Sequence, residues 1–248
     1  MLKLAIVYEA PADAKLGSCI ADRVIVSCIE WLHVDPDLLA YQREWITDHK
    51  GVPFRWDRVD DLGRNINFPI RGRFDDEKDY PDFRAAVRVL RTIQFLFDDI
   101  DAVVLIRDLD NQPERANGLE QAKNRFDEKS GAFRVVVGAA QTKRECWVLA
   151  GFFPRDDFEK GLLEEERRYL GFDPTTKSHE LTAKNSENKD KRSAKRVLKK
   201  LTQENLDREE ECWTCTPLDE LRSKGQTNGL ADYLQQVEEV LVPMVRRG

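Results

Sequence analysis

Three carboxylates stand directly behind largely apolar segments of the sequence. Glu9 follows residues 2–8, and Asp108 and Asp110 follow residues 102–106. If these segments are neighbouring parallel strands, their carboxyl ends meet at one edge of a sheet, where ligands of open α/β sheets collect. In an extended backbone the two carboxylates of an Asp-x-Asp sequence point to the same side. Because Mg²⁺ prefers such hard oxygen ligands, the sequence predicts a divalent-metal site formed by these three acids.

Each of these acids also has a simpler interpretation. Acids behind a strand often cap the following helix or belong to a turn, which could account for Asp108 or Asp110. Glu145 opens a predicted helix after the apolar residues 133–140. It is either a further metal ligand or an acid that stabilises a helix N-terminus by roughly 0.3–1 kcal/mol. Asp13 stands at the start of the first predicted helix, and we interpret it as a cap.

A basic segment in the second half of the chain could bind nucleic acid. Residues 177–200 contain nine Lys or Arg residues and three acids. On a helix, four of the basic residues share one face: Arg192, Lys195, Arg196 and Lys199. Such a face could contact phosphates, which Lys and Arg chiefly bind. Alternatively, it is a solvated helix face paired against the acid-rich residues 204–211.

The elements that must position these side chains follow from hydrophobic periodicity. We predict strands at residues 2–8, 52–56, 102–106 and 133–140. We predict helices from residue 11 to about 32, over 36–45, 82–98 and 114–129, and over 142–152. Residues 57–82, rich in charge, Gly, Asn and Pro, are predicted to be a long excursion.

Strands that alternate with helices predict an α/β fold with an open, mostly parallel sheet and helices on both of its faces. From about residue 154 the apolar strands disappear and charged helical segments continue to the end of the sequence. We therefore predict an α/β domain over residues 1–153 and a charged helical C-terminal extension over residues 154–248 that packs on it.

Bulk composition excludes several classes of protein. No apolar run approaches the roughly 18–20 residues that span a bilayer, and the first residues lack the features of a signal peptide, so we expect a cytoplasmic protein without a membrane partner. The formal charge of −6 argues against a surface that binds nucleic acid all over. The motifs of serine hydrolases, P-loop NTPases and dinucleotide-binding enzymes do not occur in the sequence.

Three short motifs together resemble the Toprim domain of OLD-type nucleases, primases and topoisomerases. They are VYEAPAD around Glu9, IRDLD around Asp108 and Asp110, and RECWVLAGF with Glu145 and Trp147. Their order more closely resembles the small Toprim-like proteins of prokaryotic defence and mobile loci, the RloB-like and DUF4276-like families. The resemblance covers residues 2–152. It departs at Ala10, where the family usually has a Gly that lets the backbone approach phosphate closely.

The resemblance implies a Mg²⁺- or Mn²⁺-dependent nuclease that cleaves the phosphodiester bonds of DNA or RNA in antiviral defence. It assigns Glu9 to proton transfer and Asp108 and Asp110 to the metal. Nucleic acid would be the substrate, and a protein partner such as an ATPase would supply any ATP hydrolysis. Two other hypotheses use the same residues: a catalytically inactive interaction subunit, and a sensor that binds a nucleotide at the edge of the sheet without cleaving it.

Overall fold

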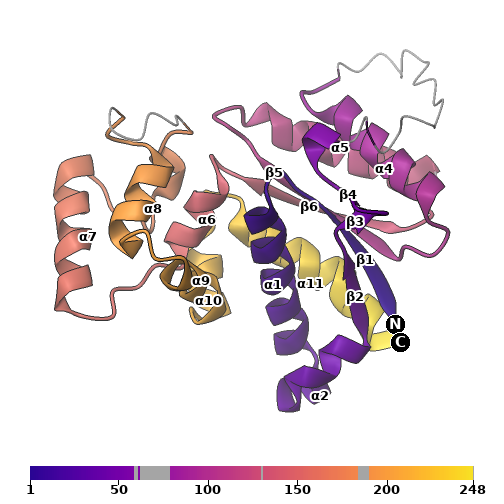
Figure 1. Cartoon of the computed structure of the whole chain (residues 1–248), viewed down its shortest axis with the longest axis horizontal. Helices are drawn as coiled ribbons and strands as arrows, with labels where there is room; N and C mark the ends of the chain where they lie inside the picture. Colours follow the sequence, from indigo (N-terminus) through magenta and orange to yellow (C-terminus); the bar gives the residue numbers. More distant parts are fainter. Residues whose placement is uncertain (59–60, 62–78, 130, 184–189, 248) are drawn as a thin grey trace.

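The protein is an α/β structure built on a four-stranded parallel sheet (Figure 1). The computed structural model describes residues 1–58, 61, 79–129, 131–183 and 190–247. The strand order is β2-β1-β5-β6, with these bounds: β1 Leu2–Val7, β2 Arg43–Ile46, β5 Ala102–Asp108 and β6 Arg134–Ala140. A small antiparallel pair, β3 (Asp48–His49) and β4 (Val52–Pro53), follows β2. The predicted fold class is confirmed.

Helices flank the sheet and predominate in the chain after β6. Those before the third strand of the main sheet are α1 Pro11–Cys28, α2 Glu30–Val34 and α4 Phe83–Leu96. Those after it are α5 Glu114–Lys129, α6 Arg144–Ala150, α7 Asp157–Leu170, α8 Ala194–Thr202, α9 Leu206–Thr214, α10 Leu218–Lys224 and α11 Leu230–Arg247. Short 3-10 helices lie at Pro36–Tyr41, Trp56–Arg58 and Ser178–Glu180.

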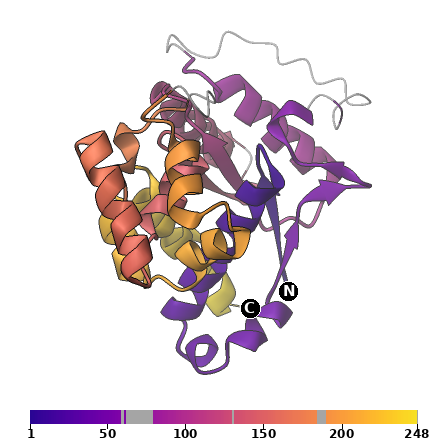
Figure 2. The same ribbon diagram turned by 60° about the vertical axis from the view of Figure 1, so that its left-hand side comes forward.

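The two faces of the sheet bury two separate apolar clusters, because successive side chains of a strand point to opposite faces. On one face, Leu4 and Ile6 of β1 pack with α1, α6 and α11. On the other face, Ala5 and Val7 pack with α4 and α5. The second view shows the sheet enclosed between these helices (Figure 2). Helices on both faces explain why the strands read as continuous apolar runs in the sequence.

One strand was predicted at the wrong place. Residues 52–56 form the short β4 and an isolated parallel bridge between Arg55 and Tyr8, whereas the strands that pair with β1 along its length are β2 and β5. Trp45 therefore lies in a strand and not in the helix predicted over 36–45, which ends at Tyr41 as a 3-10 helix. Most of the predicted excursion at residues 57–82 lies outside the described residues.

The last helix returns to the sheet. Helix α11 packs against both β6 and α1, and it places Tyr233, Leu234 and Val237 in the apolar cluster that contains Leu4 and Ile6. The apolar core on this face thus draws on residues from both sides of position 153, and the division of the chain there stays a prediction. Within the described ranges, no helix combines the length and hydrophobicity needed to cross a membrane.

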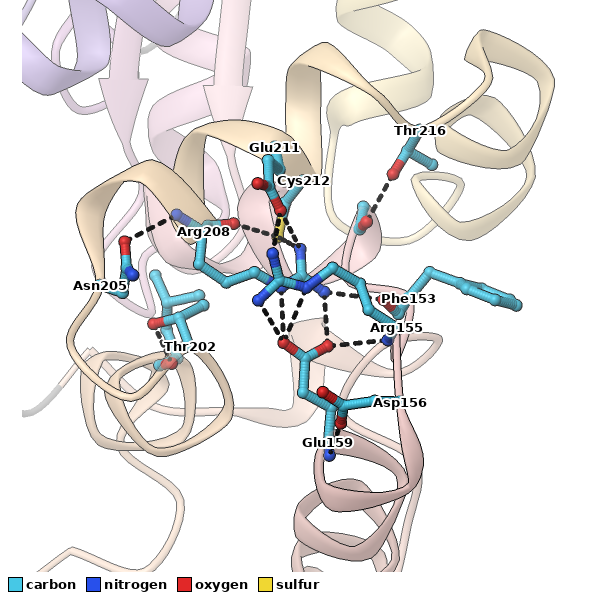
Figure 3. A network of polar contacts seen from close by, with 12 residues as sticks. Phe153, Arg155, Asp156, Glu159, Thr202, Asn205, Arg208, Glu211, Cys212 and Thr216 are labelled. Carbon is cyan, nitrogen blue, oxygen red and sulfur yellow. Dashed lines mark hydrogen bonds and ion pairs between the residues drawn. The ribbon is translucent and has the colours of Figure 1, made fainter.

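A buried ion pair ties the C-terminal helices together (Figure 3). Arg208 of α9 donates from Nε to Oε1 of Glu159 at 2.9 Å and from Nη2 to Oε2 at 3.0 Å. Arg155 adds two further hydrogen bonds to Oε1 of the same carboxylate. The Glu159 side chain is only 1% exposed and that of Arg208 is 5% exposed. The chain from α7 to α9 is therefore held by charge as well as by apolar contacts.

Candidate functional site

The topology brings the predicted acids to one edge of the sheet. Strands β1 and β5 are parallel neighbours, with Val7 opposite Leu105. Glu9 comes two residues after the end of β1, and Asp108 is the last residue of β5. The prediction that these two strands lie side by side and end at the same edge is confirmed. It is the feature on which a shared site depends.

Asp108 is a buried carboxyl among other acids. It is 8% exposed, and its Oδ1 accepts a hydrogen bond of 2.7 Å from the backbone N–H of Arg144. Burial raises the pKa of Asp108 to about 8, helped by the negative charges of Asp13, Glu9 and Glu145, while the Arg144 N–H opposes the shift. Desolvation and neighbouring like charges both disfavour an ionised carboxylate, and at Asp108 they outweigh the hydrogen bond from Arg144.

Asp110 lies in a turn and not in the extended backbone expected for an Asp-x-Asp pair. Its φ is 49°, in the left-handed region. The strand ends at Asp108, and the chain turns at once, as the 2.7 Å hydrogen bond from the N–H of Gln112 to the carbonyl of Leu109 shows. The expectation that period-two alternation aligns the two carboxylates was wrong at Asp110. Its side chain is held by Arg115 Nη1 at 2.9 Å and by Lys143 Nζ at 3.4 Å.

Glu9 is half-buried and has one cationic partner. Arg107 Nη1 lies 2.6 Å from its Oε1, and the Arg107 Nε lies 2.8 Å from Asp82 Oδ2. Burial raises the pKa of Glu9, Arg107 lowers it, and the charges of Asp110 and Asp13 raise it. The net upward shift leaves Glu9 readier to hold a proton near neutral pH than an ordinary glutamate, which suits a group that transfers protons.

Asp13 belongs to the site as well as to its helix, which we did not foresee. Its Oδ2 accepts a 2.7 Å hydrogen bond from the N–H of Ala10, which confirms its role at the start of α1. Its other oxygen lies 3.5 Å from Nε of Arg144. It is 5% exposed and its charge acts on both Glu9 and Asp108. A cap position in the sequence gave no sign of this second contact, since it depends on where α6 packs.

Arg144 connects the site to the C-terminal helices. Besides Asp13, its guanidinium lies 4.0 Å from Glu145 and 3.6 Å from Glu209 of α9. Glu145 stands in the first turn of α6, and its charge acts on Asp108. The structure thus places Glu145 near Asp108 as well as in the first turn of its helix, a position that is compatible with both of its predicted roles.

We call Glu9, Asp13, Asp108, Asp110 and Glu145 the acidic cluster. In type, its carboxylates fit a hard divalent cation, and the upward pKa shift of Asp108 marks negative charge that a cation would relieve. Their present arrangement does not form a ready site. Among the described residues, no three His, Cys, Asp or Glu side chains are grouped so as to hold a metal ion. Binding would require carboxylates to exchange their Arg or Lys partners for the cation.

The predicted nucleic-acid face lies on and just before α8, a helix that packs against α6 and α7. Arg196 is engaged within the protein, with Nη2 2.6 Å from Oε2 of the buried Glu166. Arg192 is exposed and lies over the ring of Phe172 at 5.4 Å. Lys195 and Lys199 are half-buried. Glu165 and Glu166 of α7 pair with Arg196 and Lys200 of this basic segment. Glu209, within residues 204–211, interacts electrostatically with Lys199, so the acid-rich segment also faces part of this helix. Residues 184–189 of the basic segment lie outside the described residues.

Comparisons with known proteins give no independent assignment. No family model matches this chain, and no curated protein or solved structure matches it significantly. The function must therefore be inferred from the site itself and from the resemblance of its motifs.

Proposed function

We propose that this chain is a Mg²⁺- or Mn²⁺-dependent nuclease whose centre is the acidic cluster. The buried carboxyl of Asp108 carries the proposal, since burial and then the charges of Asp13, Glu9 and Glu145 raise its pKa at the carboxyl edge of the sheet. A protein stabilised only by its core gains nothing from such an arrangement, and strongly shifted carboxyls in a shared site are typical of functional centres. The motifs around Glu9 and Asp108 that resemble Toprim domains give the proposal its reaction class.

Within this proposal the residues have separate roles. Asp108 and Asp110 would hold the cation, with Glu145 as a further ligand, and Glu9 would carry a proton to or from the reacting oxygens. A bound divalent cation would polarise the scissile phosphate. Its ligands must be ionised, so protonation of Asp108 would oppose metal binding below a pH of about 8.

The cations that now pair with the acids have a use in the same reaction. Arg107, Arg115 and Lys143 lie within 3.5 Å of carboxylates of the site or of Asp82. If the carboxylates bound a metal ion, these side chains would lose their present partners and could bind the negative oxygens of a phosphodiester, for which Arg and Lys are well suited. The phosphodiester would then take the place of the carboxylates as the negatively charged partner of these Arg and Lys side chains.

The broader assignment follows from the resemblance. We propose DNA or RNA as the substrate, with Arg192, Lys195 and Lys199 as phosphate contacts beyond the centre and Arg196 in a structural role. We further propose a cytoplasmic role in antiviral defence together with a protein partner such as an ATPase, because the sequence has no P-loop of its own.

One observation favours a second function. Glu9 and Asp110 already have close Arg or Lys partners, so part of the acidic cluster is neutralised without a metal ion. A closed network of this kind suits a catalytically inactive subunit that keeps the fold and binds a partner protein.

Cleavage by the purified protein tests both proposals. Plasmid DNA, single-stranded DNA and RNA are incubated with Mg²⁺, with Mn²⁺ and with a chelator. We expect metal-dependent cleavage that is lost in a Glu9→Gln, Asp108→Asn, Asp110→Asn triple variant. It should be retained in Asp37→Asn, an exposed acid outside the cluster. Cleavage that survives in the triple variant would remove the acidic cluster as the centre. A wild-type protein that neither cleaves nor binds the metal ions would favour the interaction subunit.

A further inference from the structure

A hollow in the surface is built on the chain segments that also carry the acidic cluster, and its side chains are of a different kind. It has a volume of about 590 Å³, within the range of small-molecule sites. It runs along the outer edge of β6, between the start of α5 and the start of α11. Leu109, which stands between Asp108 and Asp110, is one of its lining residues. Gln141, two residues before Lys143, is another. The hollow and the acidic cluster are thus built on the same two chain segments.

The floor of the hollow is apolar and its rim is rich in amides. Leu109, Val137 and Ala139 give carbon surfaces against which a flat ring can lie. The rim includes Gln141, Gln226 and Gln235, whose amides have two N–H donors and an acceptor oxygen each. Gln226 and Gln235 use one of their N–H groups within the protein, on the Arg222 carbonyl and on Glu239. Such a combination suits a planar heterocycle whose edge carries donors and acceptors.

The acidic side chains of the lining disfavour a phosphate in this hollow. They are Glu120 and Asp232; His179, which is hydrogen-bonded to Thr227, also lines it, and no Lys or Arg from the described part of the chain does. Glu120 already accepts a 2.6 Å hydrogen bond from Gln236, whereas Asp232 is exposed at the rim. A carboxylate accepts hydrogen bonds and donates none, so the preferred ring carries N–H donors.

We propose that this hollow binds the nucleobase of a nucleotide that lies next to the cleaved phosphate, and that it favours bases with an exocyclic amino group. The inference rests on the proposed nuclease function for the position of the phosphate. The two sites bind different parts of the nucleotide: the acidic cluster with its Arg and Lys partners binds the charged backbone, and the hollow, which has apolar, amide and acidic side chains, binds the base. A nucleotide is the common ligand that has both parts side by side.

Nucleosides test the hollow without involving the acidic cluster. Binding of guanosine, inosine, cytidine and uridine is measured by NMR titration in a chelating buffer, since these probes carry no phosphate and need no metal ion. We expect guanosine to bind more tightly than inosine, and cytidine more tightly than uridine, because each pair differs in the amino group. Absence of binding by all four, or equal binding within both pairs, would overturn the proposal.

Substitutions locate the binding. Ala116→Phe places a ring in the hollow from α5, and we expect it to weaken nucleoside binding at least tenfold. Ala85→Phe is the matched control, an exposed alanine in the first turn of the neighbouring helix α4, and it should bind as the wild type does. Undiminished binding by a folded Ala116→Phe variant would place the nucleoside elsewhere and refute the assignment.

The outcomes separate this inference from the nuclease proposal. Nucleoside binding without any cleavage would refute the nuclease and leave the hollow standing as a base-binding site. Cleavage that Ala116→Phe does not impair, with no nucleoside binding, would refute the hollow and leave the nuclease. Displacement of the nucleoside by a short oligonucleotide would support the proposal that the hollow binds a base of a nucleic-acid strand. Displacement by a mononucleotide but not by the oligonucleotide would contradict it and identify a free nucleotide as the ligand.

Discussion

The backbone N–H of Arg144 donates to the carboxyl of Asp108, which joins the first turn of α6 to the end of β5. The same hydrogen bond is the main contact that favours the ionised form of Asp108, and burial among other acids outweighs it. Ionising Asp108 in the folded protein therefore costs free energy, and the pH dependence of stability measures this cost.

Asp108→Asn is expected to stabilise the metal-free protein at high pH. The pKa of Asp108 in the folded protein, about 8, is above its ordinary value of 3.8, so the folded state binds the proton more tightly than the unfolded state. The stability of the wild type should therefore fall as the pH rises from about 4 to about 8. Urea unfolding at pH 9 in a chelating buffer should show the variant more stable, by on the order of 2 kcal/mol. Asp37→Asn should show no such gain, and a less stable Asp108→Asn protein at pH 9 would contradict the shift.

Divalent cations are expected to raise the melting temperature of the wild type. Binding to the folded state alone contributes about 2.7 kcal/mol at a hundredfold excess over Kd, which corresponds to a rise of roughly 5–10 °C for a chain of this size. Because protons compete for Asp108, the rise should be larger at pH 8.5 than at pH 6.5. Differential scanning fluorimetry with Mg²⁺ and Mn²⁺ measures it. An equal rise in the Asp108→Asn, Asp110→Asn double variant would move the metal away from the acidic cluster.

Glu159→Gln is expected to destabilise the protein strongly. It leaves the Arg208 guanidinium buried with only part of its charge compensated, a loss of roughly 3–5 kcal/mol. Glu165→Gln on the same helix is the control, since its carboxylate is 57% exposed and its pair with Lys200 contributes at most about 1 kcal/mol. Equilibrium urea unfolding of both variants gives the comparison. Similar small losses would show that the Glu159–Arg208 pair does not stabilise the C-terminal helices.

The same carboxylate predicts an acid limit. Burial alone would raise the pKa of Glu159, but hydrogen bonds from Arg208 and Arg155 outweigh burial and lower it to about 2. A depressed pKa contributes stability above the ordinary value of 4.5, and this contribution is lost as the pH falls from there towards 2. Over that range the wild type should lose stability faster than Glu159→Gln does, as measured by urea unfolding at successive pH values.

Arg192 and Arg196 are expected to separate nucleic-acid binding from folding. Arg196→Gln removes one of the two cationic partners of the buried Glu166, leaving Lys200 at 3.1 Å, and should lower the free energy of unfolding by up to roughly 3 kcal/mol. Arg192→Gln should leave stability nearly unchanged and, if it removes one phosphate contact, reduce the salt dependence of duplex binding by about 0.9 in the log–log slope. Fluorescence anisotropy at several salt concentrations checks the second effect. An unchanged slope would take Arg192 out of the interface.

Two helical glycines are expected to respond in opposite directions to alanine. A Cβ at Gly118 of α5 would overlap the carbonyl oxygen of Pro81, so Gly118→Ala should force α4 and α5 apart and destabilise the protein. A Cβ at Gly161 of α7 would meet no atom within 4 Å. Gly161→Ala should therefore stabilise the protein by roughly 0.5–1 kcal/mol. Melting temperatures of the two variants decide it, and a stabilised Gly118→Ala protein would contradict the close packing of these helices.

The sequence predicted those elements whose patterns are long and regular. The strands β1, β5 and β6 and the helices α4 and α5 were found because their apolar residues repeat over many positions. The strand β2 was missed because it is short and lies at an edge of the sheet, and the spacing of its Trp45 from Leu38 and Tyr41 also fits a helix. Short edge strands have little pattern of their own, so only pairing with β1 identifies this one.

The site was predicted in part for a similar reason. Glu9 and Asp108 follow strong strands, so their meeting at one edge of the sheet could be inferred. The turn at Asp110 and the contacts of Asp13 with Arg144 could not, because they depend on where α6 packs against the sheet. The local sequence pattern does not predict how α6 packs against the sheet. The basic face was misjudged at Arg196 because its partner, Glu166, lies 30 residues earlier in the chain.

The position of α11 has a consequence for how the protein is made. This helix supplies Tyr233, Leu234 and Val237 to the cluster beneath β1, β5 and β6, yet it is synthesised after every strand of the sheet. Until then that side of the nascent sheet exposes apolar surface, and domains generally fold as units during synthesis. Folding of this face must therefore wait for residues 230–247. A chain that stalls or ends before them would leave the apolar face of the sheet exposed, and chaperones would bind there.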